Sequence, residues 1–348
     1  MVSLKKRYLH LWKSGHPYFI SERDKMLTTR FTELVGCTTP VQLAGMGGMT
    51  SPELVAAVSN AGGLGMIAAV QLNEAAIVSA FQSIRGLTSG KVGLNFLVPF
   101  VNEADVEAGS ALADVVEFFF GEPDANLVAR AHQHNALVSW QVGSVDEAKA
   151  AVDVGCDFLI AQGVEAGGHV RGTQPVQELL EAVCQFTNVP VLAAGGVSTG
   201  TGLAATIKLG GDGVRIGSRF LLAHESVAHP TYIAALLASG ADDTVHTLAY
   251  SGGWPEAPHR VLKSCIEAAT ALPSDEPVGT SRIGDQDVPV PRFNVAPPNI
   301  HSKGRVDAMC LYAGESIEFI NTRESAREIV LDVVTQAEAQ LEPAGDDI

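Results

Sequence analysis

The stretch FLIAQGVEAGGH, residues 158–169, contains the unit from which much of the chain is built. A short apolar run, Phe158–Gln162, is followed directly by a glycine-rich turn. The same order returns at VLAAGG (residues 191–196) and at GVRIGS (residues 213–218). Apolar runs without polar alternation are typical of strands buried on both faces of a parallel sheet. The pattern therefore predicts repeated strand–turn–helix units.

Outward from this stretch, apolar runs and helix-like segments alternate from about residue 41 to 240. The predicted strands are Val41–Gly45, Leu64–Ala69, Val92–Val98, Val115–Phe120, Leu137–Val142, Phe158–Gln162, Val189–Ala194 and Gly213–Gly217. The predicted helices are Pro52–Ala61, Glu74–Ile84, 103–113, Asp124–His134, Val145–Val154, Val176–Phe186, Gly200–Leu209 and Pro230–Ala238. Eight strands with helical crossovers predict an α/β fold of the (β/α)8 TIM-barrel type.

Composition changes along the chain predict four segments. Residues 1–25 lack clear patterning and are expected to be an N-terminal extension, while residues 26–240 form the barrel. Eight of the 17 prolines fall between Pro255 and Pro298, so residues 241–308 are expected to form a helical and irregular cap. Residues 309–348 are a closing segment, in which Arg323–Leu341 has apolar residues at helical spacing.

The overall composition limits the partners. The 348 residues are 46% hydrophobic and carry a net charge of −16, which argues against nucleic acid or an anionic membrane as partner. Five scattered cysteines without a CxxC pair favour neither a disulfide scaffold nor a zinc site, and they predict a cytoplasmic protein. No apolar run reaches the length of a membrane span. We expect a small-molecule substrate and no metal, and the sequence leaves open whether the chain forms a homo-oligomer.

Glycine-rich turns follow the first, sixth, seventh and eighth predicted strands. In a barrel these loops meet on one face, and the loops after strands seven and eight commonly bind phosphate. Glycine lets backbone N–H groups approach an anion closely, which would offset the repulsion from the acidic protein. Each turn alone is equally compatible with a tight loop that has no ligand. Their coincidence at four strand ends favours an anion site.

His169 ends the Glu-Ala-Gly-Gly-His turn, where an imidazole is suited to proton transfer near neutral pH. Other motifs are weaker. His224–His229 is one residue too long for the zinc-binding HExxH pattern. Gly196–Gly200 matches the GxSxG pattern of hydrolases, for which Asp212 and His259 could nominally complete a triad. The preceding double glycine suits a phosphate turn better.

Taken together, the ordered motifs resemble nitronate monooxygenases, also called 2-nitropropane dioxygenases. The resemblance runs from about Thr29 to Phe220, and less clearly to residues 311–314. The motifs that carry it are Gly45-Met46-Gly47-Gly48, Gly93-Leu94-Asn95, Glu165-Ala166-Gly167-Gly168-His169, Ala193-Ala194-Gly195-Gly196 and Gly217-Ser218-Arg219-Phe220. It implies an FMN-dependent barrel that uses O2 to oxidise alkyl nitronates to a carbonyl compound and nitrite.

The same resemblance implies roles for individual residues. His169 would be the catalytic base or would orient the substrate. The cofactor-binding residues would be Gly45, Met46, Gly47, Asn95 and Gln141 along the flavin ring, Gln162 at its polar edge, Gly167 and Gly168 in the turn, and Gly195, Gly196, Gly217 and Ser218 at the phosphate. Some relatives have lysine at position 141 and an acidic residue at position 162, where this chain has neutral amides. A cation there would stabilise an anionic reduced flavin.

Two alternatives keep the flavin. An NAD(P)H-dependent FMN enoyl-thioester (enoyl-ACP) reductase would share the barrel and a similar Glu-Ala-Gly-Gly-His turn. A flavin-binding barrel without turnover would bind FMN and oxidise nothing. A dehydrogenase of the inosine-phosphate type is disfavoured because residues 163–173 lack the cysteine nucleophile that its chemistry needs.

Overall fold

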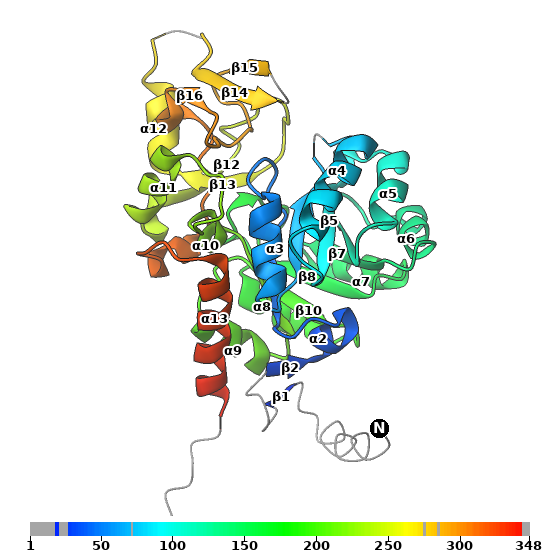
Figure 1. The fold of residues 1–348 in the computed structure, drawn as a ribbon. Coiled ribbons are helices and arrows are strands. Elements are labelled where there is room, and N and C mark those ends of the chain that lie inside the picture. Colours follow the sequence, from blue (N-terminus) through cyan, green and yellow to red (C-terminus); the bar gives the residue numbers. More distant parts are fainter. Residues whose placement is uncertain (1–17, 21–26, 71, 274–275, 284–285, 343–348) are drawn as a thin grey trace, which may run out of the picture.

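The computed structural model describes residues 18–20, 27–70, 72–273, 276–283 and 286–342. The predicted extension, residues 1–25, lies outside the described residues except for β1 (Tyr18–Ile20), which pairs with β2 (Leu27–Thr29). The rest of the chain forms a barrel and a cap built on one end of it (Figure 1).

Eight parallel strands form one sheet in the order β3-β11-β10-β8-β7-β6-β5-β4. A parallel bridge between Gln42 and Leu64 joins the two edges, so the sheet closes into a barrel. The strands are β3 (Val41–Leu43), β4 (Gly65–Ala68), β5 (Val92–Leu97), β6 (Val115–Phe119), β7 (Leu137–Val142), β8 (Phe158–Gln162), β10 (Val191–Ala194) and β11 (Gly213–Ile216). All eight predicted strands are confirmed, and so is the predicted TIM barrel.

Helices cover the outside of the barrel (Figure 1). They are α3 (Pro52–Asn60), α4 (Glu74–Arg85), α5 (Glu103–Ser110), α6 (Ala125–His132), α7 (Val145–Asp153), α8 (Val176–Cys184), α9 (Gly200–Lys208) and α13 (Ala326–Leu341). The predicted closing helix is therefore present as α13, which packs against both α9 and α3. A Cβ on Gly200 would lie 2.3 Å from the Cβ of Gln336, so α9 begins with a residue that lets α13 approach closely.

The N-terminal end of the barrel is closed by β2 and α2 (Arg30–Val35). Phe31 packs edge-on against Phe158 at the start of β8, with ring centroids 5.3 Å apart. Arg30 pairs with the fully buried carboxylate of Asp212, which immediately precedes β11, at 2.6 Å. Ligand access is therefore left to the opposite end, where the carboxyl ends of the strands lie.

The chain leaves the barrel after α10 (Ser218–Leu221) and forms the cap. Its elements are α11 (Pro230–Leu237), β12 (Thr244–Thr247), β13 (His259–Leu262), α12 (Lys263–Thr270), β14 (Gly279–Ile283), β15 (Gln286–Val290) and β16 (Lys303–Gly304). The prediction of a helical and irregular segment missed these strands. The prolines of this segment argue against strands when only the sequence is considered. Pro289 is compatible with a strand because β15 is an edge strand, where proline's lack of an N–H costs no hydrogen bond to a neighbouring strand.

The cap has a hydrophobic core of its own. Tyr232 of α11, Tyr250, Val261 and Leu311 are all buried in it. The Tyr250 hydroxyl lies 3.0–3.2 Å from three backbone carbonyl oxygens of the cap, the closest being that of Cys265. The segment boundaries at residues 240 and 308 stay predictions.

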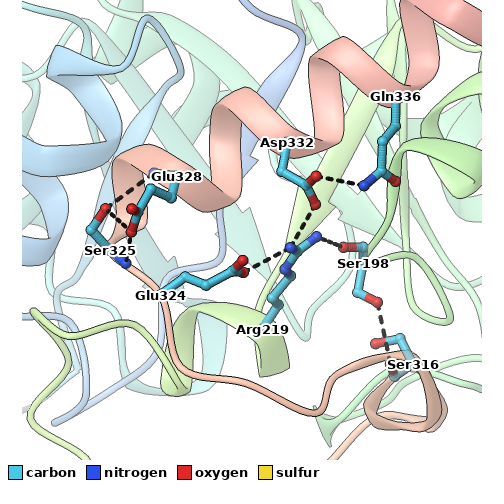
Figure 2. A network of polar contacts seen from close by, with 8 residues as sticks. All are labelled: Ser198, Arg219, Ser316, Glu324, Ser325, Glu328, Asp332 and Gln336. Carbon is cyan, nitrogen blue, oxygen red and sulfur yellow. Dashed lines mark hydrogen bonds and ion pairs between the residues drawn. The ribbon is translucent and has the colours of Figure 1, made fainter.

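A buried arginine links the segment where the chain enters the cap to the segment where it returns to the barrel (Figure 2). Arg219 of α10 donates to the carbonyl oxygen of Ser198 at 2.8 Å. It also pairs with Glu324 at 2.9 Å and with Asp332 of α13 at 2.8 Å. The start of the cap, the loop after β10 and the closing helix are thus fixed to one side chain.

Candidate active site

The predicted glycine-rich loops meet at the carboxyl ends of the strands. A Cβ on Gly217, after β11, would lie 3.4 Å from the Cβ of Ala44 and 3.7 Å from Met46 Sδ, in the loop after β3. A Cβ on Gly195, after β10, would lie 2.8 Å from the backbone nitrogen of Ala166, in the turn after β8. The structure therefore brings the four loops together in two contacting pairs.

Close backbone approach explains several of these glycines. At Gly45, a Cβ would meet the Cβ of Asn95 at 2.6 Å, so no larger residue fits there without displacement. Gly195 and Gly196 have φ values of 98° and 67°, in the left-handed region that favours glycine. In the described part of the chain, the N–H groups of Gly195 and Gly196 donate to no backbone carbonyl. They are available to an anion.

The remaining predicted loop residues lie at the same face. Gly167 lies against residues 313–314, since a Cβ on it would be 2.4 Å from the Gly314 nitrogen. Gly168, with φ of 77°, opens β9 (Gly168–His169) and has free space where a Cβ would point. Ser218 Oγ accepts a hydrogen bond of 3.0 Å from the Gly314 N–H, which leaves its hydroxyl proton free to donate. The sequence analysis did not assign Gly314 to the site.

A group of polar side chains fills the barrel interior beside these loops. We call Gln42, Asn95, Glu117, Gln141 and Arg215 the interior polar cluster. Glu117 pairs with Arg215 at 2.6 Å and accepts hydrogen bonds of 2.7 Å from Gln42 and from Asn95. Arg215 also donates to the Gln141 side-chain oxygen. Burial raises the pKa of Glu117 and lowers that of Arg215, while their pairing opposes both shifts.

Sequence analysis placed Asn95 and Gln141 at the flavin but missed Glu117 and Arg215. The available signal was a charged residue inside an apolar run, in VVEFFF (residues 115–120) and GVRIG (residues 213–217). Charged residues are almost never fully buried unless they are paired, so two such residues in predicted barrel strands indicate a pair across the interior.

Gln162, expected at the polar edge of the flavin, contacts the turn that carries His169. Its amide nitrogen donates to the His169 carbonyl oxygen at 2.9 Å, and its oxygen faces the Arg171 N–H at 3.5 Å. His169 belongs to β9, which pairs with β13 of the cap. The cap and the end of β8 thus hold the histidine from two sides. The expected role of Gln162 at the flavin stays a prediction.

Aromatic side chains surround His169, and we call Phe120, Trp254 and Tyr312 the aromatic wall. Their ring centroids lie 5.8, 4.1 and 5.5 Å from the imidazole, respectively. Trp254 is only 9% exposed and also packs against Phe100, which is 50% exposed, so the wall extends to solvent. Phe120 has φ of 62°, an uncommon conformation for a bulky residue, of the kind often found at functional sites.

The surroundings keep His169 neutral. Burial, and to a lesser extent His259, whose ring centroid is 5.6 Å away, lower its pKa to about 3. The carbonyl groups of Ala257 and Pro258 act weakly in the opposite direction. The Tyr312 hydroxyl lies 3.2 Å from Nε2, whereas Nδ1 is buried and makes no hydrogen bond. Sequence analysis assigned no role to Trp254 or Tyr312, because each comes from a segment far from His169 in the chain.

The structure does not assemble the hydrolase triad. Ser198 Oγ donates to the Ser316 carbonyl oxygen, while Asp212 is paired with Arg30 at the other end of the barrel. Across the described ranges, no group of three or more His, Cys, Asp or Glu residues is placed to hold a metal ion. No helix among the described residues is long and apolar enough to cross a membrane.

Fold and site define a (β/α)8-barrel enzyme with glycine-rich loops and a half-buried histidine, whose Nδ1 is buried, at the carboxyl ends of its strands. A sequence profile of the nitronate monooxygenase family matches residues 28–111 and 106–336. The chain therefore belongs to the nitronate monooxygenase family and is a flavin-dependent oxidoreductase. The resemblance inferred from the motifs is confirmed.

Relatives of several kinds match the chain. A (3aS,4S,5R,7aS)-5-hydroxy-7a-methyl-1-oxo-octahydro-1H-indene-4-carboxyl-CoA dehydrogenase of Mycobacterium tuberculosis is 35% identical over 242 residues, which cover 68% of this chain and 67% of the relative. A probable nitronate monooxygenase of Staphylococcus aureus is 32% identical over 270 residues, covering 64% and 76%.

Two solved structures extend the similarity to most of the fold. FabK from Thermotoga maritima superimposes with a TM-score of 0.73 and 26% identity, covering 90% of this chain and 97% of that one. The nitroalkane oxidase from Streptomyces ansochromogenes gives a TM-score of 0.70 and 26% identity, covering 89% and 98%.

Proposed function

We propose that the protein binds FMN and oxidises alkyl nitronates with O2, giving a carbonyl compound and nitrite. Nitroalkanes would be substrates where His169 removes the α-proton. Support comes from family membership and from the similarity to the Streptomyces nitroalkane oxidase. The observation that carries the proposal is the unpartnered Nδ1 of His169, buried at the carboxyl ends of the barrel strands.

The residues at the strand ends fit a phosphorylated flavin. The N–H groups of Gly195 and Gly196 and the hydroxyl of Ser218 are donors for the phosphate. The carboxylate of Glu165, whose Cβ lies 3.5 Å from a Cβ placed on Gly196, accepts hydrogen bonds from the Val176 N–H at 3.1 and 3.2 Å, which directs its charge toward the start of α8. Bound there, the flavin supplies electron transfer from the donor to O2, and the chain supplies binding and orientation.

His169 has one nitrogen suited to take a proton. The Tyr312 hydroxyl has a single proton, which it donates to the Val295 carbonyl oxygen at 2.8 Å. Toward His169 it therefore acts as an acceptor, which places the imidazole proton on Nε2. Nδ1 is then the unprotonated nitrogen, and it has no partner in the protein. We infer that Nδ1 is the general base.

A base with a pKa of about 3 binds a proton weakly until a negative charge forms beside it. Loss of the α-proton from a nitroalkane creates that charge on the nitronate, and an adjacent anion raises a histidine pKa. The aromatic wall excludes water around the pair, so their attraction is weakly screened. The site therefore favours donors whose anion stays in contact with the imidazolium.

A second candidate acts on a thioester, as in NAD(P)H-dependent enoyl-thioester reduction. The observation that favours it is the 35% identity to a dehydrogenase whose name specifies a carboxyl-CoA substrate. Both candidates use the same barrel face and the same flavin. They differ in the donor that reduces it.

An absorbance spectrum of the purified protein, with FMN added if needed, tests the proposal. An alkyl nitronate and NADH are then added separately under nitrogen. We expect flavin bands that bleach with the nitronate and not with NADH. Bleaching by NADH alone would favour the reductase, and a protein that binds no flavin would contradict the proposed cofactor.

A further inference from the structure

A buried ion pair crosses the barrel interior directly below the glycine loops. Glu117 has no exposed surface, and Arg215 is 9% exposed. Arg215 is the third of four residues in β11 and is separated from Gly217 by one residue. Glu117 is in register with Ser139 of β7, whereas Gln141 lies two residues further along that strand. At about 3.3 Å per residue, Gln141 is some 6–7 Å nearer the carboxyl ends.

The pair therefore has a direction. Asn95 and Gln42 donate to the carboxylate of Glu117, which is also paired with Arg215 Nη2. The other terminal nitrogen of Arg215, Nη1, donates to Gln141. The negative end is enclosed by donors within the barrel. The positive end is directed to Gln141, which lies nearer the carboxyl ends of the strands than Glu117 does.

Arg215 also determines which way the Gln141 amide faces. A guanidinium has donors and no acceptor, so only the Gln141 oxygen can face it. The Gln141 nitrogen, Nε2, must then point away from Arg215. The Gln141 side chain is 1% exposed, and Nε2 has no hydrogen-bond partner. Buried polar groups are rarely left unpaired in native proteins, so Nε2 is a donor without its acceptor.

Other polar atoms of the barrel strands are unpaired as well. Gln42 Oε1, Ser139 Oγ and Arg215 Nε are also buried without a partner. All of them lie in strands of the barrel sheet, and Gly45 of the loop after β3 lies against Asn95 of the same cluster. The unpaired atoms thus occupy the part of the barrel interior that adjoins the proposed flavin site.

We propose that Arg215 is a positioning residue for the flavin: it holds Gln141 so that Nε2 donates to the isoalloxazine ring, and it directs positive charge there. This inference rests on the proposed FMN site. A polarised donor stabilises the anionic reduced ring more than the oxidised ring. Arg215, acting through Gln141, would supply positive charge at the ring.

The test is the two-electron midpoint potential of bound FMN. Glu117→Gln combined with Arg215→Gln removes both charges and leaves no uncompensated ion in the barrel. We expect the affinity for reduced FMN to fall about tenfold relative to oxidised FMN, which corresponds to about 30 mV in a two-electron couple. The single substitution Arg215→Lys should leave the midpoint potential close to that of the wild type, because a cationic donor remains.

A cycle with Gln141→Leu separates positioning from a general structural effect. If Arg215 acts through Gln141, removing the two charges in a Gln141→Leu background lowers the potential no further than Gln141→Leu alone. Fully additive losses would overturn the inference. The matched control is Arg30→Gln with Asp212→Asn, which neutralises the ion pair at the other end of the barrel. We expect it to leave the potential unchanged.

An unchanged potential in the charge-free variant that still binds FMN would also overturn the inference, while the proposed function would stand. A wild-type protein that binds no FMN would refute both. If the variant binds FMN more weakly, its dissociation constants for oxidised and reduced FMN can be measured separately. Their ratio gives the same information as the midpoint potential. An unchanged ratio counts against Arg215 in the same way.

Discussion

The interior polar cluster and the aromatic wall lie at the same end of the barrel but differ in charge. The first contains a buried ion pair, and the second surrounds a neutral histidine. The cluster keeps the ion pair between β6 and β11 in the interior by surrounding it with donors and an acceptor from β3, β5 and β7. The wall keeps His169 neutral by burying it among rings, two of which come from the cap region. The comparison indicates a division of labour. In the proposed function, the barrel would provide a charged environment for the cofactor and the aromatic wall an uncharged one for the substrate.

The largest expected effect comes from removing the base. His169→Asn should keep bound FMN but lower turnover of a neutral nitroalkane by about 10²–10⁴-fold, the usual contribution of a general base. Oxidation of a preformed nitronate should fall much less, because its proton is already gone. Steady-state oxygen consumption with each substrate measures both rates.

His301→Asn, which changes an exposed histidine of the cap, is the matched control and should behave as wild type. Wild-type-like turnover of the nitroalkane by His169→Asn would remove His169 from the mechanism. Equal losses on the nitroalkane and the nitronate would assign it to substrate orientation.

Removing one charge from the interior polar cluster should destabilise the folded protein. Arg215→Met leaves Glu117 buried without its cation, and breaking such a pair costs about 3–5 kcal/mol of unfolding free energy. Glu117→Gln with Arg215→Gln should cost much less, because neither charge remains. Urea unfolding at pH 7 measures both. Equal destabilisation by the two variants would show that packing, and not charge, accounts for the loss.

Much of the barrel could be predicted because its strands are local. Runs such as Phe158–Gln162 are apolar along their whole length, and each is followed by a turn whose glycines identify the carboxyl end. The placement of Gly45, Gly195 and Gly217 at one face follows from the barrel topology. Asn95 and Gln141 were assigned to the flavin only through the family resemblance, and the structure places both in the interior polar cluster.

The rest depends on contacts between distant segments. Trp254 and Tyr312 reach His169 because β13 of the cap pairs with β9, and no periodicity in the proline-rich segment indicates that pairing. The Glu117–Arg215 pair depends on barrel closure, which sets strands far apart in sequence across one interior. Each charge is visible in its own apolar run, but the partner becomes visible only with the topology.

The free energy of unfolding should fall at acidic pH because His169 is neutral in the folded protein. Its pKa is about 3 in the folded protein and about 6.5 in the unfolded chain. Between these values the unfolded state binds the extra proton, so stability falls as the pH drops from 6.5 towards 3 and levels off below. His169 should contribute about 2 kcal/mol of the loss between pH 7 and pH 5. Urea unfolding of wild type and His169→Asn at both pH values isolates that share.

The variant should lose less stability on acidification than the wild type. Burial also lowers the pKa of His246 and His259, so part of the acid sensitivity should remain in the variant. Identical pH dependence in the two proteins would mean that His169 is not kept neutral by the wall.

The smallest effect should come from Tyr312→Phe, which removes one hydrogen bond and leaves the ring in the wall. Without the hydroxyl, Nε2 loses its acceptor and the imidazole is no longer held in the form with Nδ1 unprotonated. A hydrogen bond of this kind is worth about 1 kcal/mol, so nitroalkane turnover should fall about five- to tenfold. Oxidation of a preformed nitronate should be unchanged, because it needs no base. A loss confined to the nitronate, or none with either substrate, would show that Tyr312 does not determine which nitrogen of His169 takes the proton.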